Sequence, residues 1–399
     1  MTRLDYVVRR NEGKSQFPIL CEFINMVSCS FPIGVNNLLL STVNTRGFDM
    51  AKRFCICCLI MFGVQLSGLA MDQPILNGAG ATFPSPLYRK WIDVYRQYSN
   101  ARIDYLETGS GKGVQLFLDR QLDFGATDVF LADEELQRCP SEIIHIPTCL
   151  GAVVVVFNLP HLSYVRLTSD MLAAIFMGQI TRWSDERLVR ENPGLRQTDK
   201  DITVVHRSDS SGTTFLFSDY LSKAHQLWNN QMGRGNLLKW PVGIGLEGNP
   251  GVTEYVKKIP GSISYVSMNY AIENKLPVAL VQNRSGNFIL PSLQSVSLAG
   301  EVEIPKDMRL LITDTAAPDG YPISALTYLI VFKEQGYSNR SRETAESLFG
   351  FLQWITTKGQ DYTESLNYAR LPASTAPSME KALRSMTFKG DTIWNALKQ

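Results

Sequence analysis

Three short apolar runs in this chain are each followed by a loop rich in Gly, Ser and Thr and then by an amphipathic stretch. The runs are Ile75–Leu76, Ile103–Leu106 and Ile202–Val205. This alternation predicts an α/β fold in which strands lead into helices. Each loop would place small and hydroxyl residues at a helix N-terminus, where first-turn N–H groups lack internal partners and the helix dipole is positive. Helix capping alone explains one such loop, whereas three in one chain indicate a site for an anion.

The segments around these loops predict a buried core. The apolar, largely β-branched run Val153–Phe157 is typical of a strand buried on both faces. Residues 85–98 are predicted to form an amphipathic helix, because their apolar side chains recur at helical spacing and would face the core. The residues of that apolar side are Leu87, Trp91, Val94, Tyr95 and Tyr98.

An export signal is predicted near the start of the chain. After Met50 the sequence carries Lys52 and Arg53, then an apolar run at residues 54–64, then small residues that end at Ala70. This order is typical of a cleavable signal peptide over residues 50–70. The run is short for a membrane anchor, which is the alternative. Residues 1–49 are interpreted as an over-extended start with Met50 as the initiator, the alternative being a cytoplasmic extension.

The charge balance excludes one class of anion-binding protein. Lys and Arg number 39 and Asp and Glu number 38, so the formal net charge is +1. A protein that binds nucleic acid through a basic surface needs a large excess of positive charge, so we expect no nucleic-acid partner. Any anion must be held by local groups rather than by the field of the whole molecule.

Only two cysteines, Cys139 and Cys149, lie beyond the predicted signal peptide. In an oxidising compartment they could form a disulfide, and their separation along the chain permits one. Buried free thiols are the equal alternative.

The loops do not match nucleotide-binding or hydrolase motifs. A P-loop requires Ser or Thr after its lysine, but Lys112 is followed by Gly113. Phe83 stands where a dinucleotide fingerprint has its third Gly or Ala. Neither Ser110 nor Ser211 lies in a Gly-x-Ser-x-Gly elbow. The four histidines are scattered without metal-ligand spacing, so we expect no catalytic residue, no metal and no cofactor.

Three segments together resemble a known family. They are Gly78–Pro84, Asp123–Asp128 and Arg207–Thr213, and they are similar to the signature segments of the periplasmic phosphate-binding proteins of ABC-type phosphate transporters. The resemblance extends over roughly residues 74–372, nearly all of the predicted exported chain. Further matching segments are Gly178–Trp183, Lys239–Gly243, Pro260–Tyr265 and Tyr321–Ile323.

The resemblance implies a two-domain periplasmic-binding-protein fold. Each domain would be a mixed sheet flanked by helices, with hinge crossovers between the domains and a ligand cleft that closes around the ligand. Domain I is expected at residues 71–156 and 320–399, and domain II at residues 157–319. The implied function is binding of inorganic phosphate in the periplasm and its delivery, as a monomer, to the permease subunits of an ABC transporter and through them to the ATPase.

The resemblance also implies the phosphate-binding residues. The predicted set is Thr82, Phe83, Ser110, Asp128, Arg207, Asp209, Ser211, Gly212 and Thr213. Arg207 would bind phosphate oxygens through its planar fork, and Asp209 would hold it in place. Asp128 would accept the proton that phosphate retains near neutral pH. Sulfate has no such proton. Its binding would leave the buried Asp128 carboxylate without a hydrogen bond and facing a group of the same charge.

Two departures from the family pattern and two alternative functions remain. The family usually has Gly where Ser210 stands, so the backbone there would change if that Gly uses positive φ. Its second loop usually reads Gly-Ser-Ser-Gly-Gly, where this chain has Gly111 and Lys112; we expect Lys112 to accelerate anion association. The alternatives are a binding protein for another tetrahedral oxyanion, sulfate or molybdate, and a secreted phosphatase that uses Ser110 or Ser211.

Overall fold

The computed structural model describes residues 73–394. The predicted upstream extension 1–49 and signal peptide 50–70 lie outside the described residues. The main feature is an eight-stranded mixed sheet, accompanied by a three-stranded sheet and a two-stranded sheet. The strands of the main sheet are, in spatial order, β2 (Arg102–Glu107), β1 (Ile75–Gly80), β3 (Phe124–Thr127), β11 (Ser324–Phe332), β4 (Ile143–Phe157), β8 (Ser262–Ser267), β6 (Thr203–Arg207) and β7 (Ile244–Leu246). The smaller sheets are β10 (Phe288–Ile289), β9 (Leu280–Gln282) and β5 (Arg166–Leu167), and β12 (Thr387–Phe388) with β13 (Asp391–Thr392).

The main sheet has two halves that the long strand β4 joins. Residues 143–152 of β4 pair antiparallel with β11, and residues 153–157 pair antiparallel with β8. The first half, which contains β1, β2 and β3, and the second half, which contains β6, β7 and β8, each include parallel pairs. The predicted α/β fold with two mixed sheet units is confirmed.

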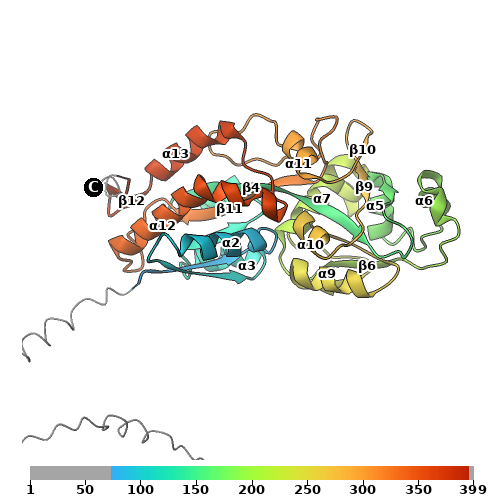
Figure 1. Cartoon of the computed structure of the whole chain (residues 1–399), viewed down its shortest axis with the longest axis horizontal. Helices are drawn as coiled ribbons and strands as arrows, with labels where there is room; N and C mark the ends of the chain where they lie inside the picture. The colour runs from blue at the N-terminus through green and yellow to red at the C-terminus, as the bar shows by residue number, and fades with distance from the viewer. Residues whose placement is uncertain (1–72, 395–399) are drawn as a thin grey trace, which may run out of the picture. The chain divides into compact units, whose positions relative to one another are not determined.

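Helices cover both halves of the sheet (Figure 1). Beside the first half lie α2 (Ser85–Tyr95), α3 (Ser110–Leu118), α12 (Arg342–Ile355) and α13 (Ala376–Arg384). Beside the second half lie α5 (Ser169–Phe176), α7 (Gly212–Ala224), α9 (Gly248–Lys258) and α10 (Met268–Glu273). The shorter helices are α4 (Asp133–Gln137), α6 (Glu186–Glu191), α8 (Gln226–Gln231) and α11 (Leu293–Ala299). None of the helices within residues 73–394 is long and apolar enough to span a membrane.

The core contains most of the predicted apolar residues. All five residues of the run 153–157 are fully buried in β4, as predicted. Trp91 stacks on Tyr88 inside α2, with ring centroids 5.6 Å apart. The prediction that Tyr98 faces the core is wrong, because this residue is 69% exposed. Helix α2 ends at Tyr95, and the chain continues in tight turns that carry the Tyr98 side chain away from the core.

Strand β1 is longer than predicted, because it continues through the glycines of the first loop to Gly80. Gly78 pairs with Tyr105 of β2 on one side and with Phe124 of β3 on the other. A Cβ atom on Gly78 would lie 2.0 Å from the Phe124 ring. A glycine that reads as a loop residue is therefore required inside the sheet, where an aromatic ring covers its backbone.

The cysteines do not form the disulfide that was one alternative. Both Cys139 and Cys149 are free. Cys149 lies fully buried inside β4, whereas Cys139 follows α4 and its Sγ contacts the carbonyl oxygen of Glu135 at 3.3 Å. The two thiols are separated because β4 holds one in the core while α4 holds the other near the surface.

Candidate functional site

The three predicted loops meet between the two halves of the sheet. Thr82 follows β1, Ser110 begins α3 and Asp128 follows β3 in the first half, whereas Arg207 ends β6 in the second half. All four side chains are buried. The second half also brings the start of α7 to this place: a Cβ atom on Gly212 would lie 2.6 Å from Ser110 Oγ and 2.7 Å from Asp128 Cβ. Residues far apart in sequence therefore form one buried site.

Backbone N–H groups are the first component of the site. Five of them have no hydrogen-bond acceptor among residues 73–394, and each belongs to a turn or to the first turn of a helix. They are the N–H groups of Thr82, Phe83, Ser110, Gly212 and Thr213. Buried N–H groups nearly always have a partner, so five together indicate a place that accepts an anion. The N-termini of α3 and α7 add positive dipole ends to the same place.

Arg207 supplies the positive charge of the site. Its side chain is 1% exposed and forms an ion pair with Asp209, with Nε donating to Oδ1 at 2.6 Å. Burial alone would raise the pKa of Asp209, but the hydrogen bonds and charge of Arg207 outweigh burial and hold that pKa below its usual value. A further guanidinium nitrogen lies 3.4 Å from Thr213 Oγ1. Asp209 therefore orients Arg207 while leaving part of its donor fork directed toward Thr213.

Asp128 is an acidic group inside this otherwise electropositive site. Thr327 on β11 donates to Oδ1 at 3.0 Å, and Ser110 Oγ lies 3.4 Å from Oδ2. Burial raises the pKa of Asp128 to about 7, although these two hydroxyls and the charge of Arg207 act in the opposite direction. Asp128 can therefore exchange a proton near neutral pH, either accepting a hydrogen bond as the carboxylate or donating one as the acid.

The remaining predicted residue, Ser211, caps α7. Its Oγ accepts a hydrogen bond of 3.1 Å from the N–H of Thr214, and its own N–H donates to the carbonyl of Asn236 at 2.8 Å. Its side chain therefore shapes the start of the helix that presents the N–H groups of Gly212 and Thr213.

Asn249 was not predicted, although it joins both sides of the site. Its side-chain Nδ2 donates to Thr82 Oγ1 at 2.9 Å and to Thr213 Oγ1 at 3.2 Å. Its Oδ1 accepts from the N–H of Ser267 at 3.0 Å, and the residue is fully buried. The sequence offered only a weak signal, a Gly-Asn pair before the amphipathic stretch of α9, because its partners lie 167 and 36 residues away.

The two departures from the family pattern also lie at this site. Ser210 has no positive φ, so serine adopts this backbone conformation without strain. The expected difference from the family's backbone stays a prediction. Its carbonyl oxygen accepts a hydrogen bond from the N–H of Gly111 at 3.0 Å. Lys112 is exposed on α3.

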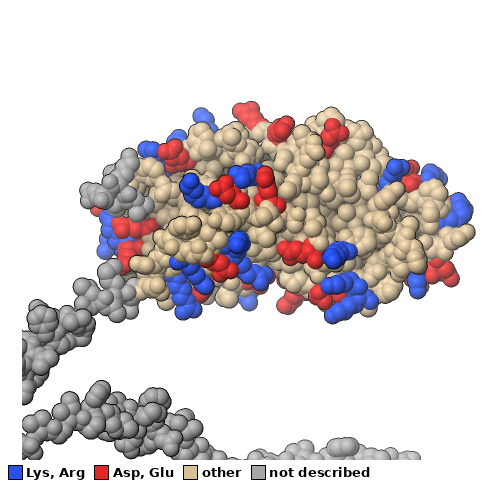
Figure 2. Space-filling model, viewed as in Figure 1, with Lys and Arg blue, Asp and Glu red and all other residues tan. Residues whose placement is uncertain are grey.

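The face of the molecule seen in Figure 2 has no large patch of positive charge that could attract an anion in place of these local groups. Figure 2 shows basic and acidic side chains interspersed over the visible face, without a large patch of one sign. The groups that hold an anion inside the site are therefore Arg207, the N–H groups and the helix dipoles.

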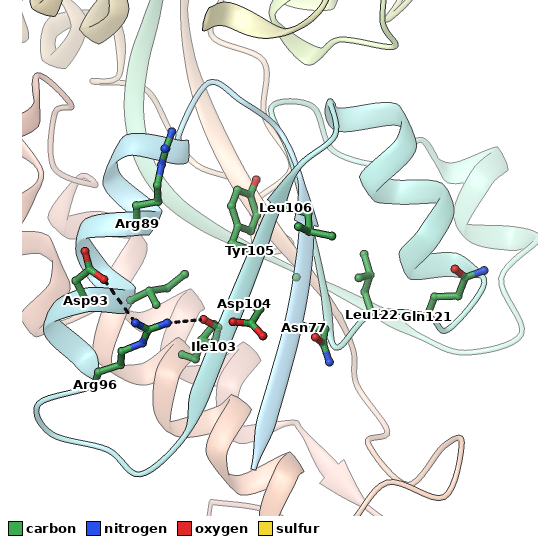
Figure 3. Close-up of a pocket in the computed structure, with 12 residues that line it drawn as sticks. Asn77, Arg89, Asp93, Arg96, Ile103, Asp104, Tyr105, Leu106, Gln121 and Leu122 are labelled. Carbon is green, nitrogen blue, oxygen red and sulfur yellow. Dashed lines mark hydrogen bonds and ion pairs between the residues drawn. The ribbon is translucent and has the colours of Figure 1, made fainter. Parts of the chain in front are cut away.

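A separate hollow of about 640 Å³ lies in the first half, lined mainly by residues of α2, β1 and β2. Figure 3 shows Arg96 there between Asp93 and the carbonyl oxygen of Ile103. The predicted site residues are not among those that line it. The positive charge of Arg96 is already paired with a carboxylate and a carbonyl oxygen. We therefore place the anion site at the five N–H groups without acceptors and not in this hollow.

Comparisons with known proteins agree on one family. A sequence model of the PBP superfamily domain matches residues 67–358. Phosphate-binding protein PstS of Haemophilus influenzae is 36% identical over 310 residues, which cover 76% of this chain and 91% of that protein. Phosphate-binding protein PstS of Methanocaldococcus jannaschii is 35% identical, with 80% and 92% covered.

Solved structures show the same fold. The periplasmic phosphate-binding protein PfluDING, solved with bound phosphate, superposes with a TM-score of 0.60 at 21% identity and covers 77% of this chain and 93% of its own. The phosphate-binding protein from Stenotrophomonas maltophilia superposes with a TM-score of 0.59 at 20% identity, with the same coverage.

Proposed function

This chain belongs to the phosphate-binding PstS proteins of the PBP superfamily, and on that premise we propose that it binds inorganic phosphate and delivers it to an ABC transporter for import. The observation that carries this proposal is the set of five unpartnered N–H groups beside a buried arginine. Phosphate offers several acceptor oxygens in a compact tetrahedron, which such a ring of donors can satisfy.

The donors divide between the two halves of the sheet. Thr82, Phe83 and Ser110 would bind phosphate from the first half, the first two through N–H groups and Ser110 through both its N–H and its hydroxyl. From the second half, Arg207 would supply charge-assisted hydrogen bonds, and the start of α7 at residues 211–213 would supply further N–H and hydroxyl donors. Bound phosphate would thereby hold the two halves together.

Asp128 would decide which tetrahedral anion is accepted. As a carboxylate it accepts the hydrogen bond of a protonated phosphate oxygen. Sulfate has no proton to donate, so an ionised Asp128 would face it as an unpaired like charge. The proposal therefore favours phosphate over the sulfate or molybdate alternative near neutral pH.

We propose a binding role rather than catalysis, and membership of a family of substrate-binding proteins supports it. The two serines that a phosphatase would use have other partners: Ser110 lies beside Asp128, and Ser211 caps α7. Neither contacts a histidine among residues 73–394. No specific observation favours hydrolysis as a second function.

Export and partners belong to the same proposal. The protein would reach the periplasm through the signal peptide at residues 50–70 and act as a monomer that presents phosphate to the permease and ATPase subunits. We assign domain I to residues 71–156 and 320–399 and domain II to residues 157–319. The change of β4 from pairing with β11 to pairing with β8 after residue 152 supports a domain boundary inside this strand.

Calorimetric titration of phosphate-stripped protein, residues 71–399, tests this function. We expect saturable one-to-one binding of phosphate at neutral pH and much weaker binding of sulfate. Equal binding of both anions would remove Asp128 from its selective role. Binding of neither would overturn the proposed function, and turnover of a chromogenic phosphate ester would revive the phosphatase alternative.

A further inference from the structure

Three tyrosine hydroxyls hold three successive carbonyl groups of the first loop. Tyr105 of β2 donates to the carbonyl of residue 81 at 2.6 Å. Tyr270 of α10 donates to that of residue 82 at 3.0 Å, and Tyr368 donates to that of residue 83 at 2.6 Å. The three tyrosines come from separate parts of the chain, yet each one fixes one peptide unit of the same loop.

These phenols act as neutral donors. Burial raises the pKa of Tyr105, Tyr270 and Tyr368 above the usual value for tyrosine. All three rings are buried or partly buried. Tyr105 lies edge-on to Tyr88 with ring centroids 5.4 Å apart, and Tyr368 lies 6.2 Å from the ring of Phe83. Packing of the rings therefore helps to fix the positions of the hydroxyl groups.

The geometry of the peptide bond connects these contacts to the candidate donors. In a trans peptide unit the C=O group and the following N–H group point in opposite directions, and the described residues contain no cis peptide. The carbonyl of Ala81 shares its plane with the N–H of Thr82, and the carbonyl of Thr82 shares its plane with the N–H of Phe83. Holding each carbonyl on one side of the loop turns the N–H to the other side.

The third contact differs in one respect. The carbonyl of Phe83 shares its peptide plane with the nitrogen of Pro84, which has no hydrogen. Tyr368 therefore binds the loop as tightly as Tyr105 does but orients no donor. This provides a matched control within the same loop.

We propose that Tyr105 and Tyr270 are positioning residues of the phosphate site that aim the N–H groups of Thr82 and Phe83 at the anion. The proposal rests on the proposed function and adds residues that do not touch the ligand. A hydrogen bond to a carbonyl also polarises the amide of the same unit, so each tyrosine strengthens the donor that it aims.

Tyr270 additionally connects donor orientation to closure. The loop belongs to the first half of the sheet, whereas α10 follows β8 in the second half. Asn249 of α9 holds the Thr82 hydroxyl from the same side. The N–H of Phe83 is thus fully oriented only when the two halves are together, which makes its contribution to phosphate binding depend on closure.

The test compares Tyr105→Phe, Tyr270→Phe and Tyr368→Phe, each of which removes one hydroxyl and keeps the ring. In 15N-labelled protein titrated with inorganic phosphate, the amide protons of Thr82 and Phe83 should move downfield on binding. Tyr105→Phe should reduce this shift at Thr82, and Tyr270→Phe should reduce it at Phe83. Tyr368→Phe should change neither, because no N–H shares its peptide unit.

Affinity gives a second readout. We expect a loss of about three- to tenfold in Tyr105→Phe, from the loss of one hydrogen bond that aims a donor. The loss in Tyr270→Phe should be smaller, because the Thr82 carbonyl keeps a long contact of 3.4 Å with the N–H of Ser85. Tyr368→Phe should lose at most about twofold.

Melting temperatures without phosphate separate positioning from general destabilisation. The proposal would be overturned if all three variants lost affinity in proportion to their loss of melting temperature, and if no variant changed the shift of one particular amide. Wild-type protein that binds no phosphate would instead overturn the proposed function. If the wild-type protein binds phosphate and the Thr82 and Phe83 amide protons shift in every variant as they do in wild type, only the positioning role is refuted.

Discussion

The N–H of Gly111 donates a hydrogen bond of 3.0 Å to the carbonyl of Ser210, which joins the start of α3 to the loop before α7. The Ser210 side chain occupies the space in front of Gly111: a Cβ atom at position 111 would lie 1.9 Å from Ser210 Oγ and 2.5 Å from Ser210 Cβ. The two departures from the family pattern thus contact each other. A serine on one side of the site requires a glycine on the other.

This complementarity predicts strong coupling between the two positions. Gly111→Ser should weaken phosphate binding at least tenfold, because the new side chain would overlap Ser210 and keep the two halves apart. Ser210→Gly alone should change binding about threefold or less. The double variant, which exchanges the two residue types, should recover to within about threefold of wild type, measured by calorimetry as a double-mutant cycle.

Additive effects of the two substitutions on phosphate affinity would contradict this prediction. If Gly111→Ser loses as much affinity with Gly at position 210 as with Ser, the new side chain does not clash with Ser210. Gln115→Ser, at an exposed and uncharged position of α3, is the control for adding a serine to this helix.

Sulfate binding should depend on pH through Asp128. The pKa of Asp128 is raised to about 7, so lowering the pH from 8 to 6 converts it from a repelling carboxylate into a neutral hydrogen-bond donor. We expect sulfate affinity to rise roughly tenfold over this range. Sulfate is the suitable probe because, unlike phosphate, it does not change its own protonation there.

The matched variant is Asp128→Asn, whose neutral amide should bind sulfate with little pH dependence between 6 and 8. Calorimetry at pH 6, 7 and 8 measures both proteins. Wild-type affinity for sulfate that stays flat across this range would assign selectivity to another group.

The same carboxylate should cost the protein stability. Because its pKa is higher in the folded than in the unfolded state, the folded state binds more protons between about pH 4 and 7. The free energy of unfolding therefore falls as the pH rises through this window. We expect Asp128→Asn to raise the melting temperature of phosphate-free protein by roughly 5 °C at pH 8 and hardly at all at pH 4. Equal shifts at both pH values would argue against titration of Asp128.

Lys112 should act on the rate of phosphate association. It is exposed on α3, which begins at the site residue Ser110. Lys112→Ala should slow association about two- to fivefold at low salt and have little effect at high salt, because screening removes long-range attraction. Stopped-flow measurement decides this, and an unchanged rate at low salt would contradict the prediction.

The thiols should differ in reactivity. Cys139 is partly exposed, whereas Cys149 is fully buried and burial raises its pKa. In residues 71–399 we expect one thiol to react with an aromatic disulfide reagent in the native protein and two after denaturation without reductant. A reducing agent should leave the melting temperature unchanged. Failure to detect any thiol after denaturation would show that a disulfide forms.

Local signals in the sequence predicted much of the site. Ser211 reads as a helix cap and caps α7, and the run 153–157 reads as a buried strand and is one. Tyr98 shows where such signals fail. Periodicity placed it on the apolar side of a helix, but the turn after Tyr95 directs it to solvent. The helical spacing of apolar residues in the sequence extends to Tyr98, although the helix and its contact with the core end at Tyr95.

The sequence alone determined the groups whose role depends on neighbours in the chain. These are the glycines and hydroxyl residues at helix starts, and Asp209, two positions from Arg207. What only the tertiary structure decided are the contacts of Asn249, Tyr270 and Thr327, whose partners at the site lie 167, 188 and 199 residues away. The physical reason is that helix starts and caps are made by local backbone geometry. The alignment of a carbonyl or the pKa of a carboxylate is instead set by whichever side chains the packed sheet brings within hydrogen-bond distance.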